Sequence, residues 1–295
     1  MSRIAIVGTG AIGSCFAAEL LRTNSHEVLL LSRHARSGLV VTTPDGTTSF
    51  PVSTATDVSH RRVQDWVVVA VKTNQTEDAA RHLSALVGPS TRVLVLQNGV
   101  EARERLRAYL NDDAIIECVV KCAAERLADG TIRRRGQAHL VVALNTAGLE
   151  LVDLFQGSAV EVTMTDDLVT AKWRKLCINV SGGSITALTQ QPMGVLRQPV
   201  GRMLAVALIA ECAAVGRALG ANLDEREQSS ILNELLLQPK FATTSMMRAR
   251  FGQEVLEHDA ISGAVLRGAQ RLGIEVPITM VVHSLLEIVS GPAIS

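Results

Sequence analysis

A glycine-rich turn near the N-terminus constrains the fold of this chain more than any other feature of its sequence. The run Gly8-Thr9-Gly10-Ala11-Ile12-Gly13 has the spacing GxGxxG, follows the apolar stretch Ile4–Val7 and opens an amphipathic stretch that ends at Arg22. In a strand–turn–helix unit the first glycine permits a tight turn, the second lets the backbone approach a pyrophosphate, and the third allows close helix–strand packing. The helix N-terminus then faces the phosphates with its positive end. The motif predicts dinucleotide binding, with an ordinary strand–helix turn as the alternative.

Short apolar runs alternate with amphipathic stretches from the N-terminus to about residue 163. Such alternation is typical of a Rossmann-type, doubly wound α/β sheet whose strands are buried on both faces. We expect strands at Ile4–Val7, Val28–Leu31, Trp66–Val71, Val93–Leu96 and Ile115–Val120, and helices at Ala11–Arg22, Thr76–Leu86 and Glu101–Leu110. We also expect two hairpins, Leu39–Val52 around Pro44-Asp45-Gly46 and Thr131–Leu144 turning near Gly136.

From about residue 166 the sequence changes character and predicts helices. Thr165 or Asp166 can cap the first of them, and Pro277 suits the first turn of the last. Further helices are expected over Met203–Leu219, Asp224–Leu237 and Val255–Leu272. The sequence therefore predicts a dinucleotide-binding domain over residues 1–163 and an all-α domain over residues 164–295. We expect the active cleft between the two.

Composition excludes several classes of partner. Lys plus Arg and Asp plus Glu both number 29, so the net charge is zero, and aromatic residues make up only 3%. This argues against a nucleic-acid-binding or polybasic membrane-surface protein. We find no apolar run of the ~18 residues that a membrane span needs, and the N-terminal apolar stretch is too short for a signal peptide. The five scattered cysteines favour neither a disulfide framework nor a zinc site, so we expect a cytoplasmic protein without a metal.

The end of the second strand indicates which dinucleotide binds. NAD-binding proteins place an Asp or Glu there to hold the ribose 2′-hydroxyl. This strand continues as Ser32-Arg33-His34-Ala35-Arg36, without a carboxylate. Arg33 can pair with a 2′-phosphate and stack on adenine, and Ser32 can donate a hydrogen bond. The sequence therefore favours NADP over NAD, while a solvated arginine in a loop is the alternative.

Polar residues at two further strand ends, and a lysine in the helical half, are candidates for the reaction site. Lys72-Thr73 and Asn98-Gly99 follow apolar runs, and ligands of such sheets bind beyond the carboxyl ends of the strands. Lys175 and Asn179 have the i, i+4 spacing that puts both on one helix face. A surface lysine with a polar neighbour is the alternative. His139 and His258 are rival acids without a visible partner in the sequence.

These motifs, taken in order, resemble the ketopantoate reductase (2-dehydropantoate 2-reductase) family. The resemblance covers nearly the whole chain and adds Ser245-Met246 and Glu257 in the pattern Glu-x-Asp-x-Ile-x-Gly. The shared residues are Gly8, Gly10, Gly13, Arg33, Lys72-Thr73, Asn98-Gly99, Trp173 to Asn179, Ser245-Met246 and Glu257 to Gly263. The chain departs from the family where an Asn-Pro-Leu-Thr-Ala run is replaced by residues 183–187, and at Arg248, Ala249, Ala260 and Ser262.

The resemblance implies an NADPH-dependent oxidoreductase of pantothenate and coenzyme A biosynthesis. It implies that Lys175 is the general acid, that Glu257 orients the substrate near that lysine, and that Asn98, Asn179 and Ser245 hold the substrate's oxygens. Lys72 and Asn98, which follow successive strands of the predicted sheet, are in addition candidates for the nicotinamide side of the cofactor. Two alternatives remain, a reductase of a different 2-oxo or 3-oxo acid and a non-catalytic NADP-binding regulator. The apolar helices offer a surface for a homodimer.

Overall fold

The structure, a computed structural model, describes residues 1–34, 36–58 and 62–291 and divides the chain into two compact units. Unit 1 comprises Met1–Gln97 and Ala102–Leu168, and unit 2 comprises Asn98–Glu101 and the chain from Val169 onward. The boundary that we expected between residues 163 and 164 falls inside the last strand of unit 1, β10 (Val160–Thr165). The four residues Asn98–Glu101 pack with the helical unit although they lie within the chain of unit 1.

Unit 1 holds, within the described residues, a ten-stranded sheet in the order β4-β3-β9-β8-β7-β6-β1-β2-β5, with β10 paired to β9. The strands are β1 (Ser2–Val7), β2 (His26–Leu31), β3 (Gly38–Thr43), β4 (Gly46–Pro51), β5 (Ser53–Ala55), β6 (Trp66–Val69), β7 (Arg92–Val95), β8 (Ile115–Arg126), β9 (Ile132–Ala143) and β10. The helical segments are α1 (Ala11–Arg22), η1 (Thr73–Gln75), α2 (Thr76–Leu86), α3 (Ala102–Leu106), η2 (Asp112–Ala114) and α4 (Thr146–Leu154).

The central strands run parallel, as the sequence predicted for a Rossmann-type sheet. β1 pairs in parallel with β2 on one side and with β6 on the other, and β6, β7 and β8 continue the parallel order. Alternate residues of β1 serve opposite faces: Ile4 and Ile6 belong to one apolar cluster with α1, and Ala5 and Val7 belong to another with α2. Both faces are therefore covered by helices, which explains why the strands read as continuous apolar runs.

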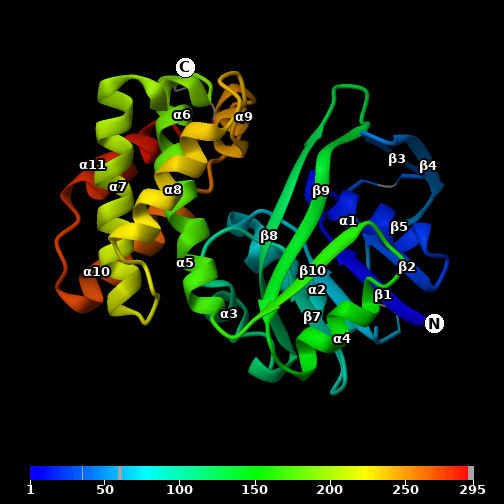
Figure 1. Ribbon diagram of the computed structural model, residues 1–295. Coiled ribbons are helices and arrows are strands. Elements are labelled where there is room, and N and C mark those ends of the chain that lie inside the picture. The colour runs from blue at the N-terminus through cyan, green and yellow to red at the C-terminus, as the bar shows by residue number, and fades with distance from the viewer. Residues whose placement is uncertain (35, 59–61, 292–295) are drawn as a thin grey trace. The chain divides into compact units, whose positions relative to one another are not determined.

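The structure confirms one expected hairpin and corrects the other. β3 and β4 pair antiparallel around the turn at Pro44-Asp45-Gly46. The hairpin expected within Thr131–Leu144 is wrong, because those residues form the single strand β9, which pairs antiparallel with β8 along its length (Figure 1). Gly136 has φ +71° and lies where the register shifts opposite Lys121 and Ala123. A glycine that marks a bulge thus resembled a turn in the sequence.

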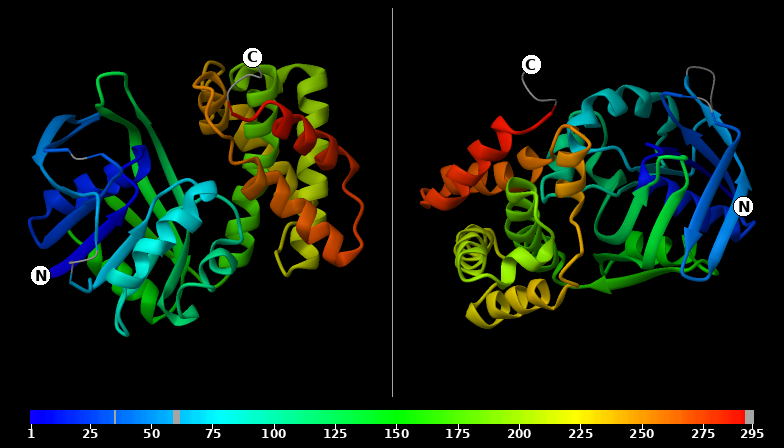
Figure 2. Two further views of the ribbon diagram at one scale, coloured as in Figure 1. Left: turned by 180° about the vertical axis from the view of Figure 1, so that it is seen from behind. Right: turned by 90° about the horizontal axis from the view of Figure 1, so that it is seen from above.

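Unit 2 is built from helices around one apolar cluster. Its described elements are α5 (Leu168–Ile178, whose first residue still belongs to unit 1), the π-turn η3 (Asn179–Gly183), α6 (Ser184–Thr189), η4 (Met193–Arg197), α7 (Pro199–Ala218), α8 (Glu225–Leu237), α9 (Ser245–Phe251), the π-turn η5 (Asp259–Gly263), α10 (Ala264–Leu272) and α11 (Pro277–Ile288). The yellow-green α7 packs against the orange α10 and the red α11 (Figure 2). The helix expected over Val255–Leu272 begins only at His258, because residues 254–256 are not helical.

By length and composition, α7 could cross a membrane, which our reading of the sequence did not anticipate. Its most apolar 18-residue window has a mean hydropathy of 1.5, and 44% of that window is buried in the structure. Ala205, Leu208 and Cys212 on this helix are fully buried in the core of unit 2. The apolar character of α7 therefore matches that of a core helix, although the pattern alone does not distinguish the two.

Candidate active site

The glycine-rich turn after β1 has the shape that dinucleotide binding requires. Gly8 has φ +104°, and a Cβ there would lie 2.7 Å from the backbone nitrogen of Val71. A Cβ on Gly13 would overlap the Gly8 carbonyl oxygen, whereas a Cβ on Gly10 would meet no atom within 4 Å. Gly10 also caps α1 without a side chain, so the first N–H groups of the helix are available to an anion. Packing thus requires the first and third glycines, and the middle one leaves room for a pyrophosphate.

The end of β2 lies beside this turn and carries positive charge. The Gly8 amide donates to the Leu31 carbonyl oxygen at 3.3 Å, and Thr9 Oγ1 donates to Ser32 Oγ at 3.0 Å. Arg33 follows with an exposed side chain. Residues 32–34 and 36, the described part of this turn, include no carboxylate. The preference for a 2′-phosphate stays a prediction.

Arg126, at the end of β8, belongs to this site but was missed in the sequence. Its guanidinium donates to the Thr9 carbonyl oxygen and, at 3.4 Å, to Ser14 Oγ. Burial lowers the pKa of Arg126, and repulsion from the charge of Arg36 lowers it further. Positive charge therefore gathers near the glycine turn, which favours an anionic ligand. The sequence signal for Arg126 would have been a strand that extends past the expected range Ile115–Val120, as β8 does. The hairpin wrongly expected near Gly136 concealed this longer strand.

The ends of β6 and β7 are joined by Gln97, a second residue that we missed. Gln97 is buried, and its Nε2 donates to the Val71 carbonyl oxygen at 3.0 Å and to Thr76 Oγ1 at 2.9 Å. These bonds hold the segment that carries Lys72, which is half-buried just before η1. Lys72 therefore has a fixed backbone at a strand end of unit 1, and its place on the cofactor side stays a prediction.

In unit 2, Lys175 and Asn179 lie at the junction of α5 and the π-turn η3. Lys175 is in the last turn of α5 and Asn179 is the first residue of η3. Both side chains are half-buried, whereas Trp173 and Leu176 on the same helix are buried in the core. A π-turn changes the direction of the side chains that follow it, and such turns are frequent at functional sites. The sequence predicted the helix here but not the π-turn.

A hydrogen-bonded chain joins Glu257, Asn98 and Asn179 within unit 2. Asn98 Nδ2 donates to Glu257 Oε2 at 3.0 Å, and Asn98 Oδ1 accepts from Asn179 Nδ2 at 3.4 Å. All three side chains are half-buried. Because the carboxylate only accepts, it fixes the orientation of the Asn98 amide, which in turn fixes that of Asn179. Three residues that lie far apart in the sequence are thus brought together as one polar group.

Arg267 holds the Asn98 segment in place and was not singled out in the sequence. Its Nε and Nη2 donate to the two carboxylate oxygens of Glu101 at 3.0 and 2.6 Å, and its Nη1 donates to Asp259 Oδ1 at 2.6 Å. These partners raise the pKa of Arg267. Gly99 has φ +96°, and a Cβ there would lie 2.6 Å from the Ala260 carbonyl oxygen. The segment therefore packs tightly on the π-turn η5, which follows Glu257.

The remaining predicted residues take different positions. Ser245 is exposed in the first turn of α9, where Thr244 Oγ1 provides the helix cap by accepting from the Met247 amide at 3.1 Å. Met246 packs against Gly183 of η3, so Ser245 starts a helix that lies beside the π-turn of Asn179. His139 Nε2 lies 2.8 Å from Thr163 Oγ1, between β9 and β10. The proposed role of Ser245 stays a prediction.

His258, the second rival acid, packs against another histidine. The rings of His258 and His283 have centroids 5.2 Å apart, and His283 Nδ1 lies 2.9 Å from Ser262 Oγ. Burial lowers the pKa of His283, and His258 lowers it further. Among the residues that the structure describes, no group of three or more His, Cys, Asp or Glu side chains could hold a metal ion.

Comparisons with known proteins identify the family. The sequence model described as "Ketopantoate reductase PanE/ApbA" matches residues 4–146, and the model of that family's C-terminal part matches residues 167–290. The chain is 34% identical over 293 residues to a 2-dehydropantoate 2-reductase of Mycobacterium tuberculosis, with 98% of each chain covered, and 32% identical over 286 residues to one of Caulobacter vibrioides, with 97% and 98% covered.

A solved structure agrees with the sequence matches. It is a dimeric ketopantoate reductase from Staphylococcus aureus, 27% identical to this chain, with a TM-score of 0.88 over 97% of this chain and 98% of that one. The match spans both the sheet of unit 1 and the helices of unit 2. Together with the glycine turn, these similarities imply a nicotinamide dinucleotide as cofactor. The chain belongs to the ketopantoate reductase family of oxidoreductases.

Proposed function

We propose that this protein catalyses the NADPH-dependent reduction of 2-dehydropantoate to pantoate, with hydride transfer to the C2 carbonyl. The observation that carries the proposal is the hydrogen-bonded chain from Glu257 through Asn98 to Asn179, with Lys175 one helical turn before Asn179. A 2-oxo acid offers carbonyl and carboxylate oxygens as acceptors, and amide and ammonium groups are the donors that such oxygens require.

Residues of unit 1, together with Asn98 of unit 2, would hold the cofactor. The turn from Gly8 to Gly13, with Thr9, Ala11 and Ile12, would bind the pyrophosphate, because open space lies over Gly10. Ser32 and Arg33 would bind the 2′-phosphate, and the charges of Arg36 and Arg126 nearby favour the additional negative charge of NADPH. Lys72 and Asn98 would face the nicotinamide. When bound, the cofactor supplies the hydride.

Lys175 would stabilise and protonate the carbonyl oxygen. As hydride reaches C2, negative charge grows on that oxygen, and an ammonium group stabilises the charge before it donates a proton. Glu257 would keep the ammonium charged and orient the substrate, since an opposite charge nearby favours the protonated form of a lysine. Asn98, Asn179 and Ser245 would bind the remaining oxygens.

The test is a screen of NADPH oxidation over a panel of 2-oxo acids that includes 2-dehydropantoate. We expect the highest kcat/KM for 2-dehydropantoate and lower values for unbranched 2-oxo acids. Turnover of another 2-oxo or 3-oxo acid in place of 2-dehydropantoate would support the alternative substrate. Tight NADPH binding without turnover of any acid would support a regulator instead and contradict the proposal.

One observation favours a different oxo acid as the second candidate. At Gly183, where the family has an asparagine, a Cβ would meet only Met246 Cε, at 3.9 Å. The backbone therefore has room for the Cβ that this protein lacks, and the amide that the family carries here is missing. Gly183→Asn should raise kcat/KM for 2-dehydropantoate if that acid is a poor substrate of the natural protein, and should not raise it otherwise.

We also propose a homodimer, since the similar ketopantoate reductase from Staphylococcus aureus is dimeric. An exposed apolar stripe on α7 supports it, with Val200 71%, Met203 67% and Val206 46% exposed. Met280 and Val281 on α11 are also more than half exposed. Such patches on one helical unit are typical of interfaces. Light scattering should give the mass of a dimer for the natural protein and of a monomer for Met203→Glu.

A cytoplasmic location completes the proposal. None of the five cysteines forms a disulfide in the structure, which agrees with a reducing compartment. Fractionation of cells that produce the tagged protein tests it, and recovery in the membrane fraction would contradict it.

A further inference from the structure

Two cysteines meet on the sheet face that α1 covers in unit 1, and neither has a part in the proposed reaction. Cys15 lies on α1, two residues after the last glycine of the turn, and is 1% exposed. Cys122 lies on β8 within the register shift between Lys121 and Ala123, and is half-buried. Both belong to the same apolar cluster, in which α1 packs against β8, and each thiol changes the pKa of the other.

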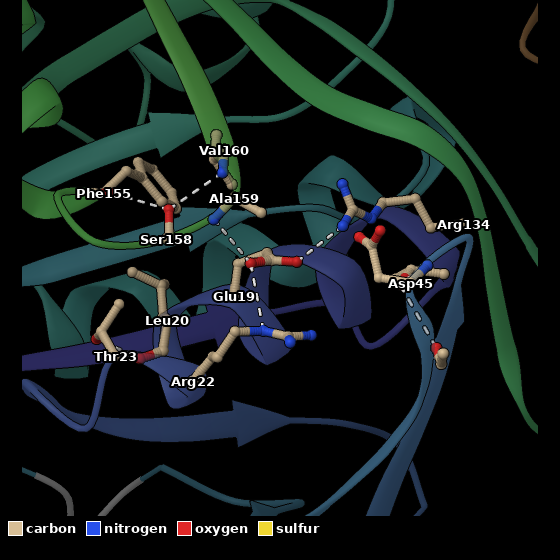
Figure 3. Close-up of polar contacts among 12 residues, drawn as sticks. Glu19, Leu20, Arg22, Thr23, Asp45, Arg134, Phe155, Ser158, Ala159 and Val160 are labelled. Atoms are coloured by element: carbon tan, nitrogen blue, oxygen red, sulfur yellow. Dashed lines mark hydrogen bonds and ion pairs between the residues drawn. The ribbon is translucent and has the colours of Figure 1, made fainter.

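A buried arginine faces this thiol pair. Arg134 on β9 pairs with Ala124 on β8, so its side chain shares the sheet face of Cys122, two residues before Ala124. Arg134 is 5% exposed and donates from Nη2 to Glu19 Oε1 at 3.0 Å. Glu19 follows Cys15 by one turn of α1 and also accepts from the Ala159 amide at 3.0 Å (Figure 3). Helix, two strands and four side chains thus form one local assembly.

The guanidinium of Arg134 is only partly satisfied. Its Nε and Nη1 are buried and have no hydrogen-bond partner in the described part of the chain. An unsatisfied buried cation favours a negative charge beside it. The neighbouring Cys15 lowers the pKa of the Cys122 thiol most, and the charge of Arg134 lowers it further, against the effects of burial and of Glu19. The pKa of the Cys15 thiol is raised by Cys122 and by burial. Because Cys122 is half-buried whereas Cys15 is 1% exposed, and because Arg134 shares its sheet face, Cys122 is the nucleophile of the pair.

We propose that Cys15 and Cys122 form a peroxide-reactive dithiol site that closes to an intramolecular disulfide between α1 and β8. The Cys122 thiolate attacks hydrogen peroxide, an S–O bond forms as the O–O bond breaks, and hydroxide leaves. The Cys15 sulfur then attacks the Cys122 sulfenic acid, the S–O bond breaks, and the hydroxyl leaves as water with the Cys15 proton. Two thiols are oxidised by two electrons, and one peroxide is reduced to two molecules of water. A dithiol reductant reverses the bond.

The helical unit contains a second thiol pair that serves as an internal control. Cys177 and Cys212 also share one apolar cluster, but both are 0% exposed. Burial is the main cause that raises the pKa of Cys212, Cys177 raises it further, and no arginine or carboxylate contributes. Two thiols in one apolar cluster are thus common to both pairs, while the neighbouring arginine and the half-buried thiol distinguish Cys15 and Cys122. If these two features confer reactivity, peroxide oxidises one pair and spares the other.

The experiment treats the full-length protein with hydrogen peroxide and counts thiols after unfolding. The natural protein has five cysteines, so we expect three thiols after oxidation and five again after dithiothreitol. Peptide mapping without reduction should show one linked pair, Cys15 with Cys122, lighter by two hydrogen atoms than the separate peptides. A link between Cys177 and Cys212, or no loss of thiols before the protein unfolds, overturns the proposal.

Three variants separate the roles of the cysteines. In Cys15→Ser the sulfenic acid cannot be resolved, so dimedone should label Cys122. In Cys122→Ser we expect no rapid thiol loss and no label on Cys15. Cys118→Ser, four residues away on β8, is the control and should still lose two thiols. If Cys122→Ser loses two thiols as fast as the natural protein, or dimedone labels Cys15 in it, Cys122 is not the nucleophile. Peptide mapping of the natural protein decides the outcome even if a variant fails to fold.

Discussion

The glycine turn of unit 1 and the polar chain of unit 2 are built in opposite ways. In unit 1 the proposed cofactor site is formed by consecutive residues, and the backbone around Gly8, Gly10 and Gly13 defines the space for the pyrophosphate. In unit 2 the polar chain is formed by hydrogen bonds among the side chains of Asn98, Asn179 and Glu257. The first kind of site is encoded in six residues, whereas the second exists only after distant segments pack. The comparison teaches that loss of a single side chain should affect the two regions differently.

If unit 2 supplies the proton, the largest effect should come from Lys175→Ala. We expect kcat to fall by ~10²–10⁴, the usual contribution of a positioned acid, with little change in NADPH affinity. Steady-state kinetics on the best oxo acid and a fluorescence titration with NADPH measure the two quantities. Lys172→Ala, earlier on α5, is the control and should keep kcat. Unchanged turnover in Lys175→Ala would remove the mechanism whatever the substrate.

If unit 1 selects the cofactor by charge, Arg33→Ala should weaken NADPH binding and leave NADH binding nearly unchanged. A charge-assisted phosphate contact contributes roughly 1.5–3 kcal/mol, or ~10- to 150-fold in Kd. Isothermal titration with both dinucleotides measures the change in Kd for NADPH and for NADH. Arg81→Ala, on the exposed part of α2, is a matched control in the same unit. Equal losses for both dinucleotides would show that Arg33 does not contact a 2′-phosphate.

Two substitutions in the glycine turn should differ in their effects on protein stability and on cofactor binding. Gly13→Ala forces a Cβ into the Gly8 carbonyl and should lower the free energy of unfolding by about 1–3 kcal/mol or more. Gly10→Ala meets no atom and should cost less than about 1 kcal/mol, yet weaken cofactor binding, because its Cβ fills the space for the pyrophosphate. Urea unfolding and a dinucleotide titration measure both variants. Equal stabilities, or unchanged binding in Gly10→Ala, would contradict the backbone-based site.

The polar chain should show coupling that the glycine turn lacks. Asn98→Ala and Glu257→Ala each remove the bond between these residues, so their effects on kcat/KM should be less than additive, by about 0.5–3 kcal/mol. Glu257→Ala should also raise KM, because the carboxylate orients the substrate in our proposal. Pairing Asn98→Ala with Glu275→Gln, on an exposed residue, is the control cycle. Full additivity in the first cycle would mean that the hydrogen bond does not position the site.

The smallest effect concerns the histidine pair beside η5. Burial and, second, His258 lower the pKa of His283, while Glu287 and Asp259 oppose this and Arg267 adds to it. The unfolded chain therefore takes up this proton at higher pH than the folded protein. The contribution of His283 to stability is complete above about pH 6.5 and is lost as the pH falls below it. Urea unfolding between pH 7.5 and about 5.5 should show a smaller loss for His283→Gln than for the natural protein. His34→Gln, on an exposed residue, is the control and should lose as much stability over this pH range as the natural protein.

The same contrast decides how far the fold and the candidate site could be predicted from sequence. The bounds of α1 and α2 agree with the prediction, because one apolar face and local start signals determine them. Asn98 was a candidate from its strand end and Asn179 from its helical spacing to Lys175, Glu257 came from the family resemblance, and the structure brings the three together. Arg267 could not be found, since its partner Glu101 lies 166 residues away and no local pattern marks the pair. The hairpin predicted at Gly136 was wrong because a glycine with positive φ occurs in bulges as well as in turns.

The four residues Asn98–Glu101 also determine how the protein can be made and divided. They leave the ribosome early, but their partners Asn179, Glu257 and Arg267 are synthesised much later. The helical unit therefore completes its polar chain only near the end of translation. A fragment that starts at Val169 would contain the lysine and the carboxylate but lack Asn98. No single cut of the gene separates two self-sufficient halves, and a split version of this enzyme would have to return that short peptide to the second half.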